Sequence, residues 1–419
     1  MSKIDHFLKE SFIYSLTKII PGLFGFVSII IFIRFLGTEE YGYFSILFLL
    51  IQISSFFCFG WLRQALLRYY SRLEKTPDYS GIILSGLVLT IIINVFVVFL
   101  FHLFKFPIKF SFISVILLSI SINLVSLIDV LFMTQEKPIK VVQLSILQSV
   151  LAILFPFLFI IFVSPSHSSV INGLVFAYSI TAIVFLIHQL KQHNPILILT
   201  LPTKNHFKQL QPLFQFGWPL SFWFATSAAL RFLDRYFIEY YLGSATMGSY
   251  AGVSEIIIKI FTVLLFPIVL ALHPRIMNLW NKQKFKHAFT LLRTAMIIQF
   301  LLFMGILVFY LVFKENIVPI LFKLIPELDP EMSHIIFPVI MGGFLWQFAL
   351  LVQKPLEINE KPRIMLLFMI IALVFNIAGN ILFIPKFGII ATAWTLVATG
   401  SIYIILNLIA SFKFLLNLK

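Results

Sequence analysis

The sequence of 419 residues has little of what a soluble protein needs. Charged residues make up only 11% of the chain and apolar residues 60%, whereas a soluble domain has about 25% charged and about 45–50% apolar residues. This composition excludes a water-soluble globular protein. The single cysteine, Cys58, also excludes an intramolecular disulfide and a cysteine metal cluster.

The motifs of common enzyme chemistries are missing as well. The chain contains no Gly-Lys dipeptide, so it has no P-loop for ATP hydrolysis. Its histidines form no H-E-x-x-H metal motif, and no G-x-S-x-G nucleophile turn occurs. We therefore expect a protein that is not an enzyme and that holds neither a metal nor a cofactor.

Long apolar runs are what the sequence has instead. A membrane-spanning helix needs about 20 apolar residues. Runs of that kind cover about 11–36, 41–62, 79–103, 111–133, 140–163, 170–190, 212–241, 247–272, 288–313, 334–353, 364–384 and 389–412. The first is too long for a signal peptide and contains Lys18. We expect an all-α integral membrane protein with twelve transmembrane helices.

The positions of the basic residues predict the orientation. Lys and Arg number 31 against 17 Asp and Glu, and such residues concentrate in cytoplasmic loops. With the N-terminus in the cytoplasm, the outer loops hold only Lys105, Lys109, Lys314, Lys323 and Lys386. We expect both termini in the cytoplasm, a longest outer loop at about 314–333, and no nucleic-acid partner.

A short repeat suggests two halves. Leu36-Gly37-x-x-x-x-Gly42 follows the first span, and Leu242-Gly243-x-x-x-x-Gly248 follows the seventh. We expect an N-terminal six-helix bundle at 1–190, a cytoplasmic linker at 191–211 and a C-terminal six-helix bundle at 212–419. A pseudo-twofold axis along the membrane normal would relate the bundles, with a central cleft. The alternative is that each Leu-Gly pair is an ordinary helix end.

Several stretches, taken in order, resemble one family of transporters. They are 34–42 (RFLGTEEYG), Gly60-Trp61-Leu62 with Arg63 and Arg68, 216–219 (FGWP), 234–236 (DRY), Asn376, Asn380, 384–388 (IPKFG), Ala391 and Ala393. The sequence is similar to the polysaccharide transporter family of the multidrug/oligosaccharidyl-lipid/polysaccharide exporter superfamily. It departs from the family pattern at Trp61, where leucine is more common, and at Thr392, where glycine is frequent.

This resemblance implies a flippase in the bacterial plasma (inner) membrane. Such a protein moves an undecaprenyl-diphosphate-linked oligosaccharide, for example an O-antigen unit of lipopolysaccharide or a capsule unit, to the outer leaflet by alternating access. The partners implied are the lipid-linked oligosaccharide, membrane lipids and the polysaccharide polymerase machinery.

Charged residues inside the spans are the candidate functional groups, because each costs about 2.5–3.5 kcal/mol on insertion. Lys18, Arg231, Arg235 and Lys259 are the predicted substrate-binding residues. Arginine in particular suits a phosphate, since its planar guanidinium donates two parallel hydrogen bonds. For Lys18 the alternative is a side chain that reaches back to the membrane surface.

Structural ion pairs are the alternative for the other charges. Helix spacing allows Arg231 to pair with Asp234 and Arg235 with Glu239. The same spacing places Lys259 one turn after Glu255. In that case the charges would neutralise one another and bind no substrate.

Three carboxylates are predicted to couple transport to an inward flow of H⁺ or Na⁺. They are Asp234, Glu255 and Asp129, and their neutralisation would favour one of two conformations. For Asp129 the alternative is a carboxylate at the membrane surface. Pro21 and Pro219 are predicted hinges, since proline removes a helix hydrogen bond; plain helix curvature is the alternative.

Two other functions stay open. One is a cation-coupled multidrug exporter of the same fold, for which an acidic or apolar cleft is expected. The other is a membrane polysaccharide polymerase or ligase, which needs a substantial outer loop with reactive groups. The dominance of arginine and lysine and the short outer loops favour the flippase.

Overall fold

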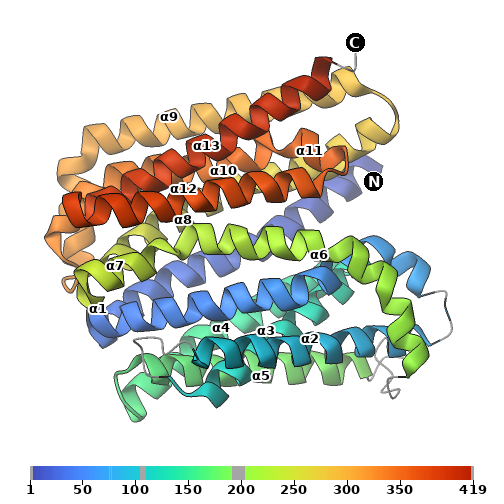
Figure 1. Cartoon of the computed structure of the whole chain (residues 1–419), viewed down its shortest axis with the longest axis horizontal. Helices are drawn as coiled ribbons and strands as arrows, with labels where there is room; N and C mark the ends of the chain where they lie inside the picture. The colour runs from blue at the N-terminus through green and yellow to red at the C-terminus, as the bar shows by residue number, and fades with distance from the viewer. Residues whose placement is uncertain (1–2, 75, 77, 104–109, 191–202, 417–419) are drawn as a thin grey trace. The chain divides into compact units, whose positions relative to one another are not determined.

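The computed structural model describes residues 3–74, 76, 78–103, 110–190 and 203–416, without the side chains of 3–15, 18, 190, 231, 232 and 412–416. Every element in this part of the chain is helical (Figure 1). The elements are α1 (Lys3–Leu73), α2 (Tyr79–Leu103), α3 (Phe112–Thr134), α4 (Pro138–Phe162), α5 (His167–Leu190), α6 (Lys204–Phe232), α7 (Asp234–Leu242), α8 (Ser244–Asn281), α9 (Phe285–Leu324), the 3-10 helix η1 (Pro330–Ile335), α10 (Ile336–Val352), α11 (Lys354–Ile358), α12 (Pro362–Phe387) and α13 (Ile389–Leu416).

The helices account for the twelve expected spans. Among the described residues, ten helices are long and apolar enough to cross a membrane. One of these, α1, bends at Gly37 and holds the first two spans. The seventh span is α6 followed by α7, which is less apolar because glutamine, proline and serine interrupt it. The prediction of an all-α membrane protein with twelve spans is confirmed.

Helices extend into two of the predicted connections. The expected outer loop at 314–333 is helical as far as Leu324, and the expected linker at 191–211 is helical from Lys204 onward. Residues 191–202 lie outside the described residues. Charged and amide residues such as Lys314 and Gln209 are good helix formers. A helix can therefore continue after it leaves the apolar part of the bilayer. A span predicted from hydropathy, by contrast, ends where the apolar residues end.

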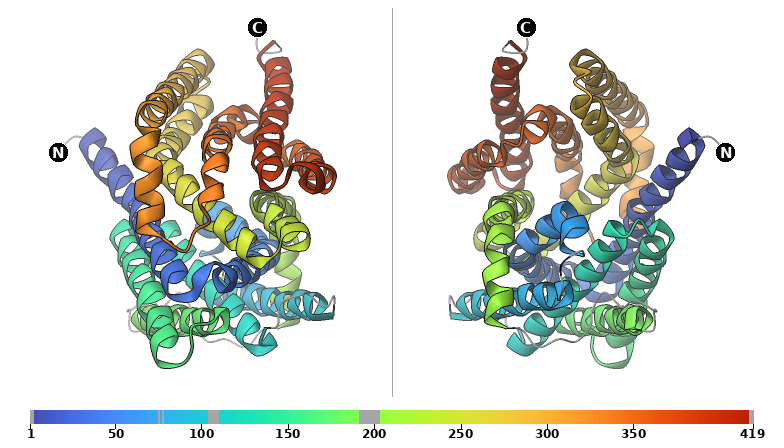
Figure 2. Two further views of the ribbon diagram at one scale, coloured as in Figure 1. Left: turned by 90° about the vertical axis from the view of Figure 1, so that its left-hand side faces the viewer. Right: turned by 90° about the vertical axis from the view of Figure 1, so that its right-hand side faces the viewer.

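The helices form two compact units. One, here called the split unit, consists of Met1–Ser45 and Leu230–Lys419; the other, the continuous unit, is Ile46–Ala229. In the split unit α12 packs along α13, and α10 packs against α8 and α13 (Figures 1 and 2). In the continuous unit α5 packs against α3 and α4. The expected division into two six-helix bundles at 191–211 stays a prediction.

A close helix crossing organises the continuous unit. A Cβ atom on Gly217 would overlap the carbonyl oxygen of Trp61, and one on Gly60 would lie 2.8 Å from the Ser221 Oγ. The Trp61 ring meets Phe214 edge to face, with centroids 5.3 Å apart. The glycines at 60 and 217 thus let α6 lie directly against the second half of α1.

The repeated Leu-Gly motif forms the same backbone turn twice, both times in the split unit. Gly37 has φ 78° and ψ 170°, and Gly243 has φ 86° and ψ 169°. This conformation is open essentially to glycine alone. The glycines that follow also meet, because a Cβ on Gly42 would lie 3.1 Å from the backbone nitrogen of Gly248.

Alanine at either turn is expected to cost about 1–3 kcal/mol of stability. No atom lies within 4 Å of a Cβ built on Gly37 or Gly243, so backbone strain is the source of the loss. Thermal unfolding of Gly37→Ala and Gly243→Ala in detergent measures it. Gly305→Ala is the control, because its Cβ also meets open space in a regular helix, where alanine stabilises by up to about 1 kcal/mol. Equal behaviour of all three variants would contradict the strain.

Candidate functional site

A break in the seventh span positions two neighbouring charges. The α-helix α6 ends at Phe232, and α7 begins at Asp234. The Asp234 side chain accepts a hydrogen bond from the backbone N–H of Arg235 at 3.1 Å. An acidic residue in the first turn of a helix is favourable because the helix dipole is positive there. Both residues are buried: Asp234 is 1% exposed and Arg235 is 4% exposed.

Arg235 lies at the centre of a polar cluster that joins α1, α7 and α8 within the split unit. Its guanidinium forms an ion pair with Glu255 at 2.6 Å and donates a hydrogen bond to the Ser45 Oγ at 2.7 Å. The hydroxyl of Tyr41 donates to the other carboxylate oxygen of Glu255 at 3.1 Å. A buried arginine is tolerated only when it is paired and hydrogen-bonded in this way.

Asp234 has a different partner. The hydroxyl of Tyr250, on α8, donates to its carboxylate at 2.6 Å. Tyr250 is itself almost fully buried. The two carboxylates predicted to couple an ion, Asp234 and Glu255, are therefore each held by a tyrosine hydroxyl, and Glu255 also forms an ion pair with Arg235.

The structure gives Arg235 a partner other than Glu239, which was the alternative partner from helix spacing. Arg235 pairs with Glu255 on α8, and Glu239 accepts a hydrogen bond from the Ser244 hydroxyl at 2.9 Å. Glu239 follows Arg235 at the spacing of a helical ion pair. The packing of α8, however, brings the carboxylate of Glu255 to the buried guanidinium of Arg235. The other predicted pair, Arg231 with Asp234, involves a side chain that lies outside the described residues.

Lys259 extends the cationic region along α8. It lies one turn after Glu255, whose carboxylate already binds Arg235 and Tyr41. Its Nζ occupies the space where a Cβ on Gly25 would stand, so the ammonium group lies against the backbone of α1. Of the four predicted substrate-binding residues, Arg235 and Lys259 thus belong to one α1–α7–α8 region. Lys18 lies in α1, but its side chain is not described.

The remaining predicted site residues lie elsewhere in the fold. Asp129 is on α3 of the continuous unit, where its carboxylate is 3.9 Å from the guanidinium of Arg63. Pro21 and Pro219 stand inside α1 and α6, and the helix continues through both. The only non-helical torsion angles inside α1 are at Gly37. The hinge roles of the two prolines stay predictions.

The cluster is completed by three residues that were not predicted from the sequence, Tyr41, Ser45 and Tyr250. One signal was present: Tyr41 and Ser45 are four residues apart in the second span, so their polar groups share a helix face. A polar group inside the bilayer needs a partner. The sequence does not indicate which of the other spans supplies that partner.

The continuous unit contains a second, uncharged polar network. The amide of Asn94 donates to Ser54 Oγ at 2.8 Å and to Ser119 Oγ at 2.7 Å, and Ser55 is hydrogen-bonded to Asn123. All five residues are buried. This network ties α1, α2 and α3 together by hydrogen bonds but offers no charge to a substrate.

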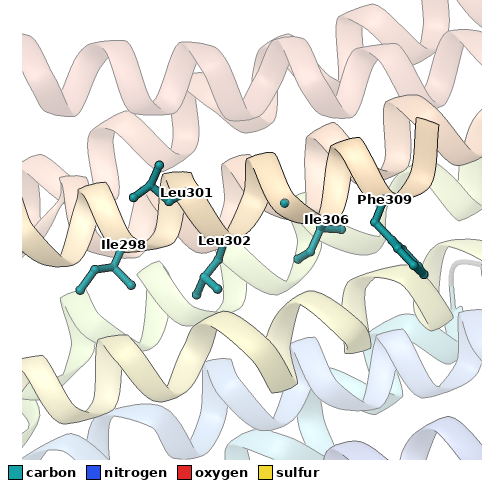
Figure 3. A pocket seen from close by; sticks show the side chains of 6 residues that line it. Ile298, Leu301, Leu302, Ile306 and Phe309 are labelled. Atoms are coloured by element: carbon teal, nitrogen blue, oxygen red, sulfur yellow. The ribbon is translucent and has the colours of Figure 1, made fainter. Parts of the chain in front are cut away.

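A surface cavity of about 500 Å³ lies along α9. Figure 3 shows Ile298, Leu301, Leu302, Ile306 and Phe309 lining it. Every lining residue comes from α9, and none carries a polar side chain. The cavity suits hydrocarbon chains and cannot hold a charged headgroup. Among the described residues no group of His, Cys, Asp and Glu could hold a metal ion.

Comparison with known proteins places the chain among transporters. A family model described as "Polysaccharide biosynthesis protein" matches residues 7–280, and the MatE model matches 219–382. A search among curated proteins found no match.

Solved transporter structures share the fold. An inward-facing multidrug resistance MATE family transporter of the MOP superfamily has a TM-score of 0.74 at 12% identity, covering 96% of this chain and 97% of that one. A MOP superfamily transporter from Pyrococcus furiosus, described as having a binding pocket of reverse polarity, has a TM-score of 0.69 at 13% identity, covering 97% and 94%.

The fold is therefore that of a multi-pass membrane transporter. The first family model spans well over half of the residues, from the first helix into α8. The chain belongs to the polysaccharide biosynthesis protein family that this model describes, and it shares the fold of transporters of the MOP superfamily.

Proposed function

We propose that this transporter is a flippase for an undecaprenyl-diphosphate-linked oligosaccharide in a bacterial plasma membrane. The observation that carries the proposal, beside the family match over 7–280, is Arg235. It is a permanently charged side chain, buried in a span and held by hydrogen-bond acceptors from two other helices. A diphosphate offers more charge and more acceptor oxygens than the single carboxylate of Glu255.

Exchange of partners at Arg235 explains how binding and coupling are linked. When a diphosphate binds the guanidinium, Glu255 loses its ion pair with Arg235 and keeps the hydrogen bond from Tyr41. A carboxylate left in this environment is costly, so it takes up a proton or Na⁺. Lys259, one turn further along α8, supplies a second positive charge for the diphosphate. The bound ion and the substrate then favour the same conformation.

The other predicted residues have roles in the same transport cycle. Both termini face the cytoplasm, Asp234 is a second coupling carboxylate, and the product is delivered to polysaccharide polymerase machinery on the outer side. Helix α1 bends at Pro21 and helix α6 bends at Pro219 as the transporter changes conformation. Lys18 and Arg231 complete the substrate site.

A multidrug exporter is the second candidate, because the MatE model matches residues 219–382. Both candidates require the same fold but opposite cargo charge. The buried Arg235 and the half-buried Lys259 repel an organic cation, which favours the flippase.

Transport in proteoliposomes separates the two functions. Purified protein is reconstituted with a labelled undecaprenyl-diphosphate oligosaccharide, and in a second set of vesicles with ethidium. We expect the labelled lipid to become accessible to a glycosidase on the opposite side, while ethidium is not moved. Vesicles without protein are the control. Ethidium export without lipid translocation would overturn the proposal.

A further inference from the structure

The turn between α8 and α9 concentrates positive charge at one end of the split unit. Lys282, Lys284 and Lys286 are all exposed there, and the turn lies at the same end as α11 and the two chain termini (Figure 1). Between Glu255 and Glu315 the sequence contains no acidic residue. The nearby Glu357, on α11, is bound by Lys354 at 2.7 Å and by His273 at 3.3 Å.

The length of α8 allows this turn to reach the membrane surface. The helix has 38 residues, which corresponds to about 57 Å, and a bilayer with its headgroups is about 40–45 Å thick. The helix is therefore long enough to cross the bilayer and bring the turn out to the headgroup layer. The turn is also held rigidly, because Trp280 packs on Phe285 and Phe289 with ring centroids 4.6 and 5.9 Å away. Tryptophan is enriched at this depth of a membrane.

Helix stability does not explain Lys286. The first turn of α9 contains Lys286 and no acidic residue, although the helix dipole disfavours positive charge at that end. A side chain that works against the local helix needs another role.

We propose that the α8–α9 turn, formed by Trp280, Lys282, Lys284 and Lys286, binds the acidic headgroups of membrane phospholipids. The lysines supply positive charge at headgroup depth, and the aromatic cluster fixes their position. Such binding would hold the end of α8, the helix that carries Glu255 and Lys259, at a fixed depth. The inference does not depend on the cargo of the transporter.

The test measures binding of dioleoyl-phosphatidylglycerol to the whole purified protein in neutral detergent by native mass spectrometry. The variant is Lys282→Gln/Lys286→Gln. The matched control, Lys314→Gln/Lys323→Gln, removes the same charge from exposed positions near the other end of α9. Since each surface lysine contributes about fivefold to binding of acidic lipid, we expect the affinity to fall by more than about tenfold in the first variant only. Binding of dioleoyl-phosphatidylcholine should not change.

Salt gives a measurement that needs no variant. At about 1 M salt, where charges are screened beyond about 3 Å, the wild-type protein should lose its preference for phosphatidylglycerol. Unchanged affinity of the Lys282→Gln/Lys286→Gln variant, an equal loss in the control variant, or a preference that resists salt would overturn the proposal.

Discussion

Gly248→Ala is expected to prevent stable folding of the split unit. A Cβ at this position would overlap the carbonyl oxygen of Thr38. This oxygen belongs to the backbone of α1, so it cannot move to another rotamer as a side chain could. Relief requires α1 and α8 to move apart, and this separates the glycine turns that the two helices share. Overpacking of this kind costs about 3 kcal/mol or more. The yield of monodisperse protein on size exclusion, and its thermal unfolding temperature, measure the loss.

A graded control lies one turn away on the same helix. A Cβ on Gly252 would meet the ends of the Ile33 and Leu328 side chains, and these can shift. Gly252→Ala should therefore cost less, about 1 kcal/mol. If Gly248→Ala were as stable as Gly252→Ala, the backbone contact between α1 and α8 would be refuted.

Arg235→Gln should abolish transport and destabilise the protein by about 3–5 kcal/mol, because it leaves Glu255 charged and without its ion pair. The loss of transport in this variant alone does not separate a binding role from a structural one. The double variant Arg235→Gln/Glu255→Gln separates the loss of stability from the loss of transport, since it removes both charges of the pair together.

We expect the double variant to recover most of the thermal stability and to remain inactive in the proteoliposome assay. Stability returns because neither member of the Arg235–Glu255 pair is left charged without the other, and activity stays lost because the diphosphate has no guanidinium to bind. Tyr41→Phe is the matched control: it removes one neutral hydrogen bond to Glu255 and should retain transport. Recovery of transport in the double variant would show that Arg235 only neutralises Glu255.

The local features of the fold were predictable, because each depends on neighbouring residues. Apolar runs of sufficient length specified the spans, and the Leu-Gly repeat located two turns that proved to have matching torsion angles at Gly37 and Gly243. Helix ends were less predictable. Hydropathy detects where a helix leaves hydrocarbon, so it placed the end of α9 before Leu324.

The partners of the buried charges were not predictable in the same way. Helix spacing offered Arg235 a neighbour in Glu239, and only the packing of α8 on α7 gave it Glu255 instead. The sequence by itself determined a helical membrane protein, its spans and its glycine turns, since hydrophobicity and glycine torsion angles act locally. The tertiary structure alone decided which carboxylate holds Arg235 and where the Lys259 ammonium lies. An ion pair depends on the distance between atoms, and packing brings together residues far apart in the chain.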